Sequence, residues 1–140
     1  MKQPVVIDSN VFFSSLRTGS KARLFHFFES NTDLTFYAPN FLVVETFKHR
    51  ERLRAKSKLT ESEFLEVLQT IVQHLRFFNE DMISTENLIY AWRLVSDIDP
   101  KDHLFVALAL ELDAKLWTRD IVLKGGLMKK GFDNFFNENQ

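Results

Sequence analysis

The sequence contains no cysteine, and this absence excludes two classes of site. Neither a disulfide bond nor a thiolate-ligated metal can form, so Asp, Glu and His are the strong metal ligands that remain. Long apolar runs are also missing: no segment approaches the ~20 apolar residues of a membrane span, and the first residues lack the apolar centre of a signal peptide. We therefore expect a cytoplasmic protein without membrane contact.

An excess of positive charge is missing as well. The chain has 18 Lys and Arg against 19 Asp and Glu, a net charge of -1. Because proteins that hold nucleic acid by bulk electrostatics need many phosphate contacts, any polyanion site here must be local. The glycine-rich loops of nucleotide-binding enzymes do not occur either, since neither a GxxxxGK[ST] nor a GxGxxG pattern is present. We expect no nucleotide cofactor.

What the sequence does contain is enough apolar material for one substantial core, with 45% hydrophobic residues in a chain of 140. We expect a single domain over residues 1–140. Short apolar runs alternate with amphipathic helical patterns, which predicts an α/β fold, a three-layer α/β/α sandwich with a mainly parallel central sheet. The strand candidates are residues 5–7, 34–38, 75–78, 115–118 and 133–136.

Local signals predict how several helices begin and end. Thr60 and Glu63 have the spacing of a capping box, and Pro39 suits the first turn of a helix that carries Glu45. The glycine pair at 125–126 is expected to break the last helix. The 15 Phe residues predict an aromatic core. Those expected in the core or at a dimer interface are Phe25, Phe27, Phe28, Phe77 and Phe78.

Four acidic residues stand at element boundaries or among apolar residues: Asp8, Glu45, Asp102 and Asp120. Asp8 and Asp120 each end a strand candidate, and ligands bind beyond the carboxyl ends of parallel strands. Clustered carboxylates repel one another unless a cation neutralises them, and Mg²⁺ or Mn²⁺ prefers such oxygen ligands. A site of this kind can hydrolyse a phosphodiester bond. The residues that could orient it by hydrogen bonds are Ser9, Asn10 and Thr118.

Each acid also has a purely structural interpretation. Asp8 or Asp120 can cap the helix that follows it, because Asp at a strand-to-helix turn accepts backbone N–H groups well. Asp102, near a helix start, can complement the helix dipole. Glu45 can face solvent or form a salt bridge. Spacing alone leaves these alternatives open.

Residues 48–58 form a basic segment after Glu45. Its cations could follow a phosphate backbone beside the acidic residues, solubilise the end of a helix, or dock an acidic partner segment. The candidate RNA contacts are Lys48, Arg50, Arg52 and Arg54. No pair of histidines has metal-ligand spacing, and His103 is the one that could approach a substrate, because it follows Asp102.

Four segments in order resemble the acidic motifs of the PIN-domain ribonucleases, most closely the prokaryotic toxins related to VapC. They are VIDSN at 6–10, AP at 38–39 with Glu45 after it, DPKDHLFVALA at 99–109 and LWTRD at 116–120. The resemblance implies a PIN-like fold and a metal-dependent endoribonuclease, the toxin of a type II toxin–antitoxin pair. It also implies that Mg²⁺ or Mn²⁺ is bound by Asp8, Glu45, Asp102 and Asp120, with Asn10 in support.

The third acid of the family lies just before the helix rich in Phe and Ala, and this segment offers Asp97, Asp99 and Asp102. We choose Asp102 because it stands three residues before Phe105, and Asp99 remains the alternative. The family commonly has Asn or Thr ahead of its fourth acid. Arg119 departs from that pattern, which bears on substrate contact more than on metal binding.

The partners that the resemblance implies are an RNA substrate, a protein antitoxin and a second copy in a homodimer. A catalytically inactive PIN-like module that binds RNA or a protein partner is the alternative, and the presence of all four acids argues against it. A phosphatase resembling the haloacid dehalogenases would need a second Asp where Asn10 stands.

Overall fold

Four strands form one parallel sheet in the order β3-β2-β1-β4, within a computed structural model that describes residues 2–138. Val6 pairs with Tyr37 on one side and with Leu116 on the other, so β1 is a central strand. The strands are β1 Gln3–Ile7, β2 Leu34–Pro39, β3 Leu75–Phe78 and β4 Lys115–Trp117. The expected parallel sheet is confirmed.

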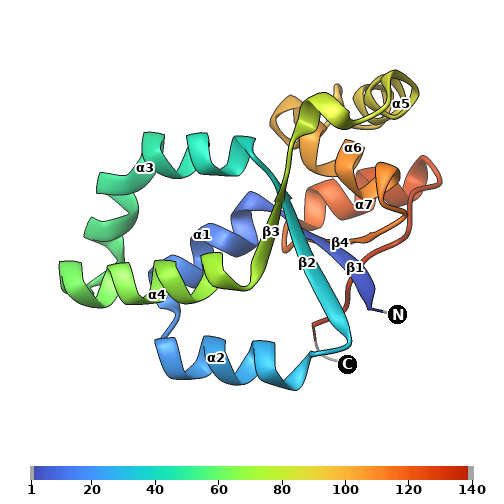
Figure 1. Ribbon diagram of the computed structural model, residues 1–140. Coiled ribbons are helices and arrows are strands. Elements are labelled where there is room, and N and C mark those ends of the chain that lie inside the picture. Colours follow the sequence, from blue (N-terminus) through green and yellow to red (C-terminus); the bar gives the residue numbers. More distant parts are fainter. Residues whose placement is uncertain (1, 139–140) are drawn as a thin grey trace.

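Helices cover both faces of this sheet. Helices α1 to α4 lie on one side of it and α5 to α7 on the other, which confirms the three-layer α/β/α architecture (Figure 1). Their bounds are α1 Ser9–Thr18, α2 Lys21–Ser30, α3 Phe41–Ser57, α4 Glu61–Gln73, α5 Thr85–Val95, α6 His103–Glu111 and α7 Ile121–Lys129. Two 3₁₀ turns span Glu80–Met82 and Pro100–Asp102.

The predicted capping box begins α4. Thr60 Oγ1 accepts the Glu63 N–H at 3.1 Å, and Glu63 Oε1 accepts the Thr60 N–H at 3.0 Å, so two backbone donors are satisfied reciprocally. Pro39 differs from the expectation: it ends β2 and does not begin α3. The following residue explains this, because the Asn40 N–H donates to Phe78 O at 3.0 Å and prolongs the strand pairing past the proline.

Two further predictions are wrong. Helix α7 continues through Gly125 and Gly126, since Leu123 and Leu127 bury its inner face completely and this packing outweighs the low helix propensity of glycine. Residues 133–136 form no strand. They make a single parallel bridge, in which Leu116 donates to Asn134 O and accepts from the Phe136 N–H, each at 2.9 Å.

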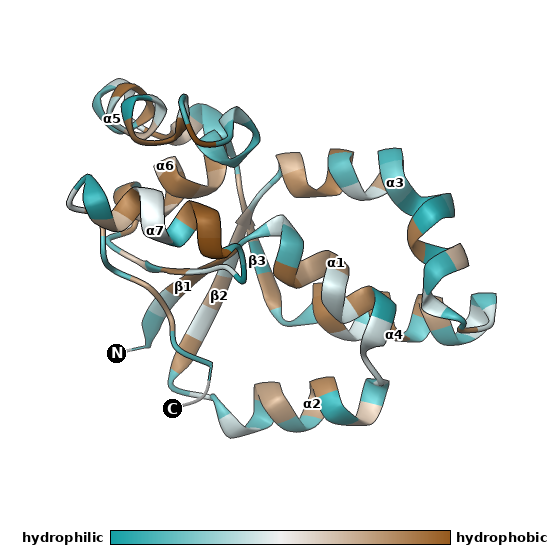
Figure 2. Cartoon of the chain, turned by 180° about the vertical axis from the view of Figure 1, so that it is seen from behind, coloured by the Kyte–Doolittle hydropathy of each residue, from teal (hydrophilic) through white to brown (hydrophobic). Residues whose placement is uncertain are grey.

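The core is centred on α6, which packs between the sheet and α5. Residues 105–109 are all buried, so this helix is apolar around its circumference, and it appears brown in Figure 2. Of the Phe residues expected inside, Phe28 is buried, whereas Phe25 is 55% exposed. Phe27, Phe77 and Phe78 pack against the core from its margin. No helix in residues 2–138 is long and apolar enough to cross a bilayer.

Candidate functional site

Asp8 lies directly after β1, at the carboxyl edge of the sheet, and its side chain is buried. Its Oδ1 accepts the Ser9 N–H at 2.8 Å, which caps α1. Its Oδ2 accepts the Thr118 hydroxyl at 2.7 Å. Asp8 therefore caps α1, and the same carboxylate is also fixed in orientation by Thr118, which directly follows the neighbouring strand β4.

Thr118 is the centre of a small hydrogen-bond network between β4 and the start of α1. Its hydroxyl donates to Asp8 and accepts from Asn10 Nδ2 at 3.2 Å and from the Asp120 N–H at 3.1 Å. Asn10 Oδ1 in turn accepts the Arg119 N–H at 3.3 Å. Asn10 and Thr118 are thus positioned to orient the acids beside them.

Asp120 begins α7. Its Oδ1 accepts the Leu123 N–H at 3.1 Å, which is an N-cap bond, and the side chain is only partly buried. The Asp120 N–H donates to the Thr118 hydroxyl, and that hydroxyl donates to Asp8, so both acids take part in one hydrogen-bond network. The two acids that were expected to share one sheet edge are therefore linked through a single hydroxyl.

Asp102 and Asp99 occupy different environments. Asp99 is partly exposed, and its Oδ1 accepts the Lys101 N–H at 3.0 Å, which caps the 3₁₀ turn. Asp102 ends that turn, is buried, and makes no capping bond to α6. Its Oδ2 is buried without a hydrogen-bond partner among residues 2–138. Asp102 thus has a buried oxygen without a partner in this part of the chain, whereas one oxygen of Asp99 already accepts a backbone N–H.

Glu45 lies in the second turn of α3, half-buried. Its Oε1 is also buried without a hydrogen-bond partner in the described part of the chain. Two cations act on it, because Lys101 and Lys48 lower the pKa of its carboxyl against the larger effect of burial. Lys101 was not identified from the sequence. Its position beside Asp102 was the available signal.

The acids influence one another electrostatically. Burial raises the pKa of the Asp8 carboxyl to about 6 and that of Glu45 to about 7, and Asp8 repels Glu45. The pKa of Asp102 rises furthest, to about 8, first through burial. Repulsion then adds to it from Asp8, Asp99, Asp120 and Glu45. Four segments far apart in the sequence thus bring their carboxylates into one electrostatic cluster.

The oxygen donors of the four acids suit a hard divalent cation, although the side chains do not converge on one point. Within residues 2–138 no three Asp, Glu or His side chains converge closely enough to hold one ion together. The donors are nevertheless all oxygen, two of them are buried and unpaired, and their repulsion is of the kind that a cation relieves. The residues present therefore match the donor chemistry that Mg²⁺ or Mn²⁺ prefers.

Of the candidate RNA contacts, Lys48 follows Glu45 within α3 and lowers the pKa of the Glu45 carboxyl. Helix α3 then leads away from the sheet (Figure 1). Arg50 pairs with Glu61 at 3.6 Å and Arg52 contacts the His49 ring at 3.1 Å, while Arg54 follows one turn beyond Arg50. The basic segment is therefore helical up to Ser57 and extends outward from the acids.

His103, considered above for substrate contact, makes structural contacts with α5. Its Nε2 lies 2.7 Å from Leu88 O, and the ring packs edge-on against Trp92. These contacts join α6 to α5.

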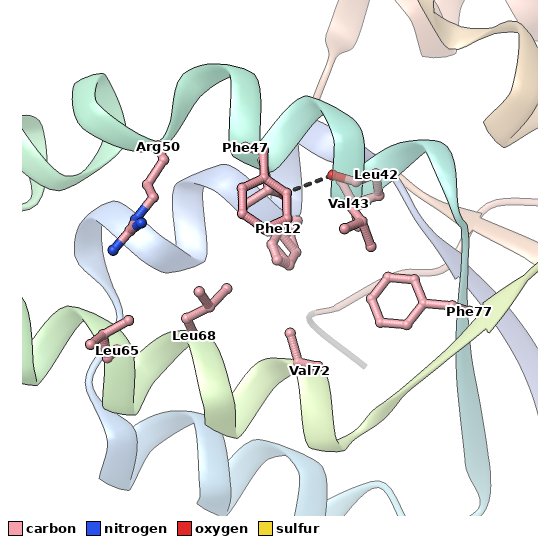
Figure 3. A pocket seen from close by; sticks show the side chains of 10 residues that line it. Phe12, Leu42, Val43, Phe47, Arg50, Leu65, Leu68, Val72 and Phe77 are labelled. Carbon is pink, nitrogen blue, oxygen red and sulfur yellow. Dashed lines mark hydrogen bonds between the residues drawn. The ribbon is translucent and has the colours of Figure 1, made fainter.

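An apolar groove of about 360 Å³ lies between α3 and α4, apart from the acids (Figure 3). Phe47 is 73% exposed at its edge, and Leu65 and Val72 face it from α4. Arg50 is the cation that lines it. Exposed apolar side chains gathered in this way commonly mark an interaction surface.

The family comparison agrees with this arrangement. A family model described as PIN domain matches residues 6–135, which includes all four acids. No curated protein matches the sequence significantly. PIN domains are generally nucleases, and such nucleases generally use divalent metals. With its parallel sheet and its acids gathered at one sheet edge, the chain belongs to the PIN-domain family.

Proposed function

We propose that this protein is a metal-dependent endoribonuclease that hydrolyses RNA phosphodiester bonds. One observation carries the proposal beyond the general nuclease activity of the family: Asp102 Oδ2 and Glu45 Oε1 are buried, unpaired and electrostatically coupled to Asp8. A purely structural role for these two acids would give each oxygen a hydrogen-bond partner, an ion-pair partner or contact with solvent. The unpaired oxygens support a ligand of opposite charge.

In this proposal Mg²⁺ or Mn²⁺ is held by Asp8, Glu45, Asp102 and Asp120. The ion, when bound, polarises the phosphoryl group and acidifies water. The protein supplies orientation. Thr118 and the Ser9 N–H fix both oxygens of Asp8, and the Leu123 N–H fixes one oxygen of Asp120, so little rotational freedom remains to be lost when RNA arrives.

Cations beside the acids bring the RNA backbone to this edge. Lys48 and Lys101 act on Glu45 and so lie within electrostatic reach of a phosphate placed at the acids. Arg50, Arg52 and Arg54 extend the basic surface outward along α3. We expect them to contribute to RNA affinity in a salt-dependent manner.

The direct test is cleavage of single-stranded RNA by the purified protein, with Mg²⁺ or Mn²⁺ and with a chelator. Asp8→Asn and Asp120→Asn should abolish cleavage. Asp33→Asn is the matched control, because Asp33 is an exposed acid at the opposite end of β2. Cleavage that survives chelation, or either substitution at the acids, contradicts the proposal.

We further propose that the protein acts as the toxin of a toxin–antitoxin pair, with a protein antitoxin, and that it forms a homodimer. Its exposed apolar groove between α3 and α4 supports a need for protein partners. Induced expression should arrest growth, and Asp8→Asn should relieve the arrest at equal protein levels. Light scattering of the purified chain reports the oligomeric state, and a monomer at every concentration contradicts the homodimer.

A non-catalytic PIN-like module that binds RNA or a protein remains a second candidate. It is favoured by one observation, that no three acidic or imidazole side chains among the described residues converge on a point. The same assay separates the two. RNA binding without cleavage under every metal condition supports the module, and chelator-sensitive cleavage supports the enzyme.

A further inference from the structure

Arg119 lies between Thr118 and Asp120, and its guanidinium contacts Glu138 and Ser14. Nε and Nη2 donate to the two oxygens of Glu138 at 3.1 and 2.9 Å, and Nη1 donates to Ser14 Oγ at 2.9 Å. A guanidinium has five N–H donors. Three are used by these bonds, which leaves donors for a further acceptor without moving the side chain.

A hollow of about 160 Å³ adjoins this guanidinium. A second guanidinium also lines it, that of Arg23, whose Nη2 donates to Thr18 O at 2.8 Å. The lining residues are Ser15, Thr18, Gly19, Arg23, Leu24 and Arg119, with no carboxylate among them. Two cations beside hydroxyl and backbone groups form a polar surface that suits an anion.

The strand order places Arg119, one of the residues that line this hollow, relative to the acids. Along the carboxyl edge, the connection after β2 carries Glu45 and Lys48, the connection after β1 carries Asp8, and the connection after β4 carries Arg119. The Arg119 N–H is bound to Asn10, which fixes it beside the acids. An RNA backbone that crosses the acids from the Lys48 side therefore reaches Arg119 next.

We propose that Arg119 and Arg23 bind a phosphate of the RNA strand beyond the one that is cleaved, and that Glu138 holds Arg119 when no RNA is bound. This inference rests on the proposed ribonuclease function. The Arg119–Glu138 pair is partly exposed, with side-chain accessibilities of 41% and 33%, and such pairs hold weakly. A phosphate offers the same two-oxygen contact, so it can replace Glu138.

The test measures binding of a short single-stranded RNA by fluorescence anisotropy, in the Asp8→Asn background so that no cleavage intervenes. Arg119→Gln should weaken binding and reduce the slope of log K against log salt by about 0.7, the value for one lost phosphate contact on a single strand. Arg23→Gln should do the same. Arg93→Gln is the control, because Arg93 lies on α5 beside Lys130, at the far end of α7 from Asp120.

Glu138→Gln distinguishes RNA binding from a structural role of the ion pair. If Glu138 competes with phosphate, Glu138→Gln tightens binding about two- to fivefold, the range that an exposed ion pair can supply. This gain should vanish when Arg119→Gln is added. If the pair only holds the C-terminal segment, Glu138→Gln lowers the melting temperature and leaves RNA affinity unchanged or weaker, which overturns the proposal.

The two proposals fail in different ways. If the wild-type protein cleaves RNA but Arg119→Gln binds RNA with unchanged affinity and salt slope, the phosphate subsite is wrong and the ribonuclease stands. If the wild-type protein neither binds nor cleaves RNA, both are wrong.

Discussion

Thr118 and Asp8 are joined by a 2.7 Å hydrogen bond between residues 110 positions apart in the chain, and no other side-chain hydroxyl contacts the Asp8 carboxylate among the described residues. The bond lowers the pKa of the Asp8 carboxyl against the larger opposing effect of burial. It therefore keeps the central acid closer to its ionised form, as a metal ligand must be.

Thr118→Val removes this hydroxyl at nearly constant volume. We expect a loss of about 1–3 kcal/mol in the free energy of unfolding, because a buried acceptor is left unpaired. We also expect a loss of about 10- to 100-fold in RNA cleavage, the usual cost of losing an outer-shell partner of a metal ligand. Chemical denaturation and an RNA cleavage assay measure the two effects. Thr118→Ser keeps the hydroxyl and should behave like the wild type in both.

The metal-free protein should become less stable as pH rises. The pKa of the Asp102 carboxyl rises from its ordinary value of 3.8 to about 8 in the fold, so between these values the folded state holds a proton that the unfolded state has released. The free energy of unfolding then falls through that window. Asp8 and Glu45 contribute in the same direction up to about pH 6 and 7.

Asp102→Asn isolates this effect. In the absence of metal it should raise the melting temperature at pH 8 by about 3–6 °C, which corresponds to roughly 1–2 kcal/mol for a chain of this size. At pH 4 it should change little, because the wild-type carboxyl is already protonated in the fold. Thermal unfolding of the wild type and the variant in the presence of a chelator, at both pH values, measures this change in melting temperature. A larger gain at pH 4 than at pH 8 contradicts the assignment of Asp102 as a repelled acid.

Metal binding should separate Asp102 from Asp99. Asp102→Asn should weaken the apparent Mn²⁺ affinity by at least about tenfold, since even outer-shell losses cost 10- to 100-fold. Asp99→Asn keeps an acceptor for the Lys101 N–H, so the 3₁₀ turn and the affinity should be largely retained. Titration calorimetry gives both affinities. The opposite ranking identifies Asp99 as the third ligand.

The glycine pair in α7 gives a test of packing. Gly125 has no neighbouring atom within 4 Å of an added Cβ, so Gly125→Ala should stabilise the protein by about 0.5–1 kcal/mol. A Cβ at Gly126 lies 2.5 Å from Ile98 Cδ1. Gly126→Ala should therefore have a lower melting temperature than Gly125→Ala. Adding Ile98→Val, which removes Cδ1, to each variant should reduce this difference in melting temperature.

The elements that could be predicted from the sequence are those with local causes. The β-branched run at 5–7 and the Thr60–Glu63 capping box depend on neighbouring residues, and both were located correctly. The glycine pair in α7 was misjudged because tertiary burial of Leu123 and Leu127 decides its conformation. Local propensity contains no information about that packing.

In the candidate site, too, features with a local cause could be predicted from the sequence and features that depend on the fold could not. Four acids could be proposed from their positions at element boundaries or among apolar residues, and the fold brings them into one electrostatic cluster. Spacing favours Asp102 over Asp99 as the third acid, but it could not show how the two carboxyls differ, because that depends on which of them accepts a backbone N–H in the fold. The Arg119–Glu138 pair had no sequence signal at all, since nothing local links residues 19 positions apart.

The single bridge between Leu116 and Phe135 has a consequence for association. It supplies β4, an outer strand of only three residues, with a neighbour on its open side. Unpaired outer strands readily recruit strands from other molecules. Detaching residues 134–136 would therefore expose a template for intermolecular pairing, in the same segment that leads to Glu138. A fusion partner attached close after this segment should promote aggregation of the protein, whereas one attached through a long flexible linker should leave it dispersed.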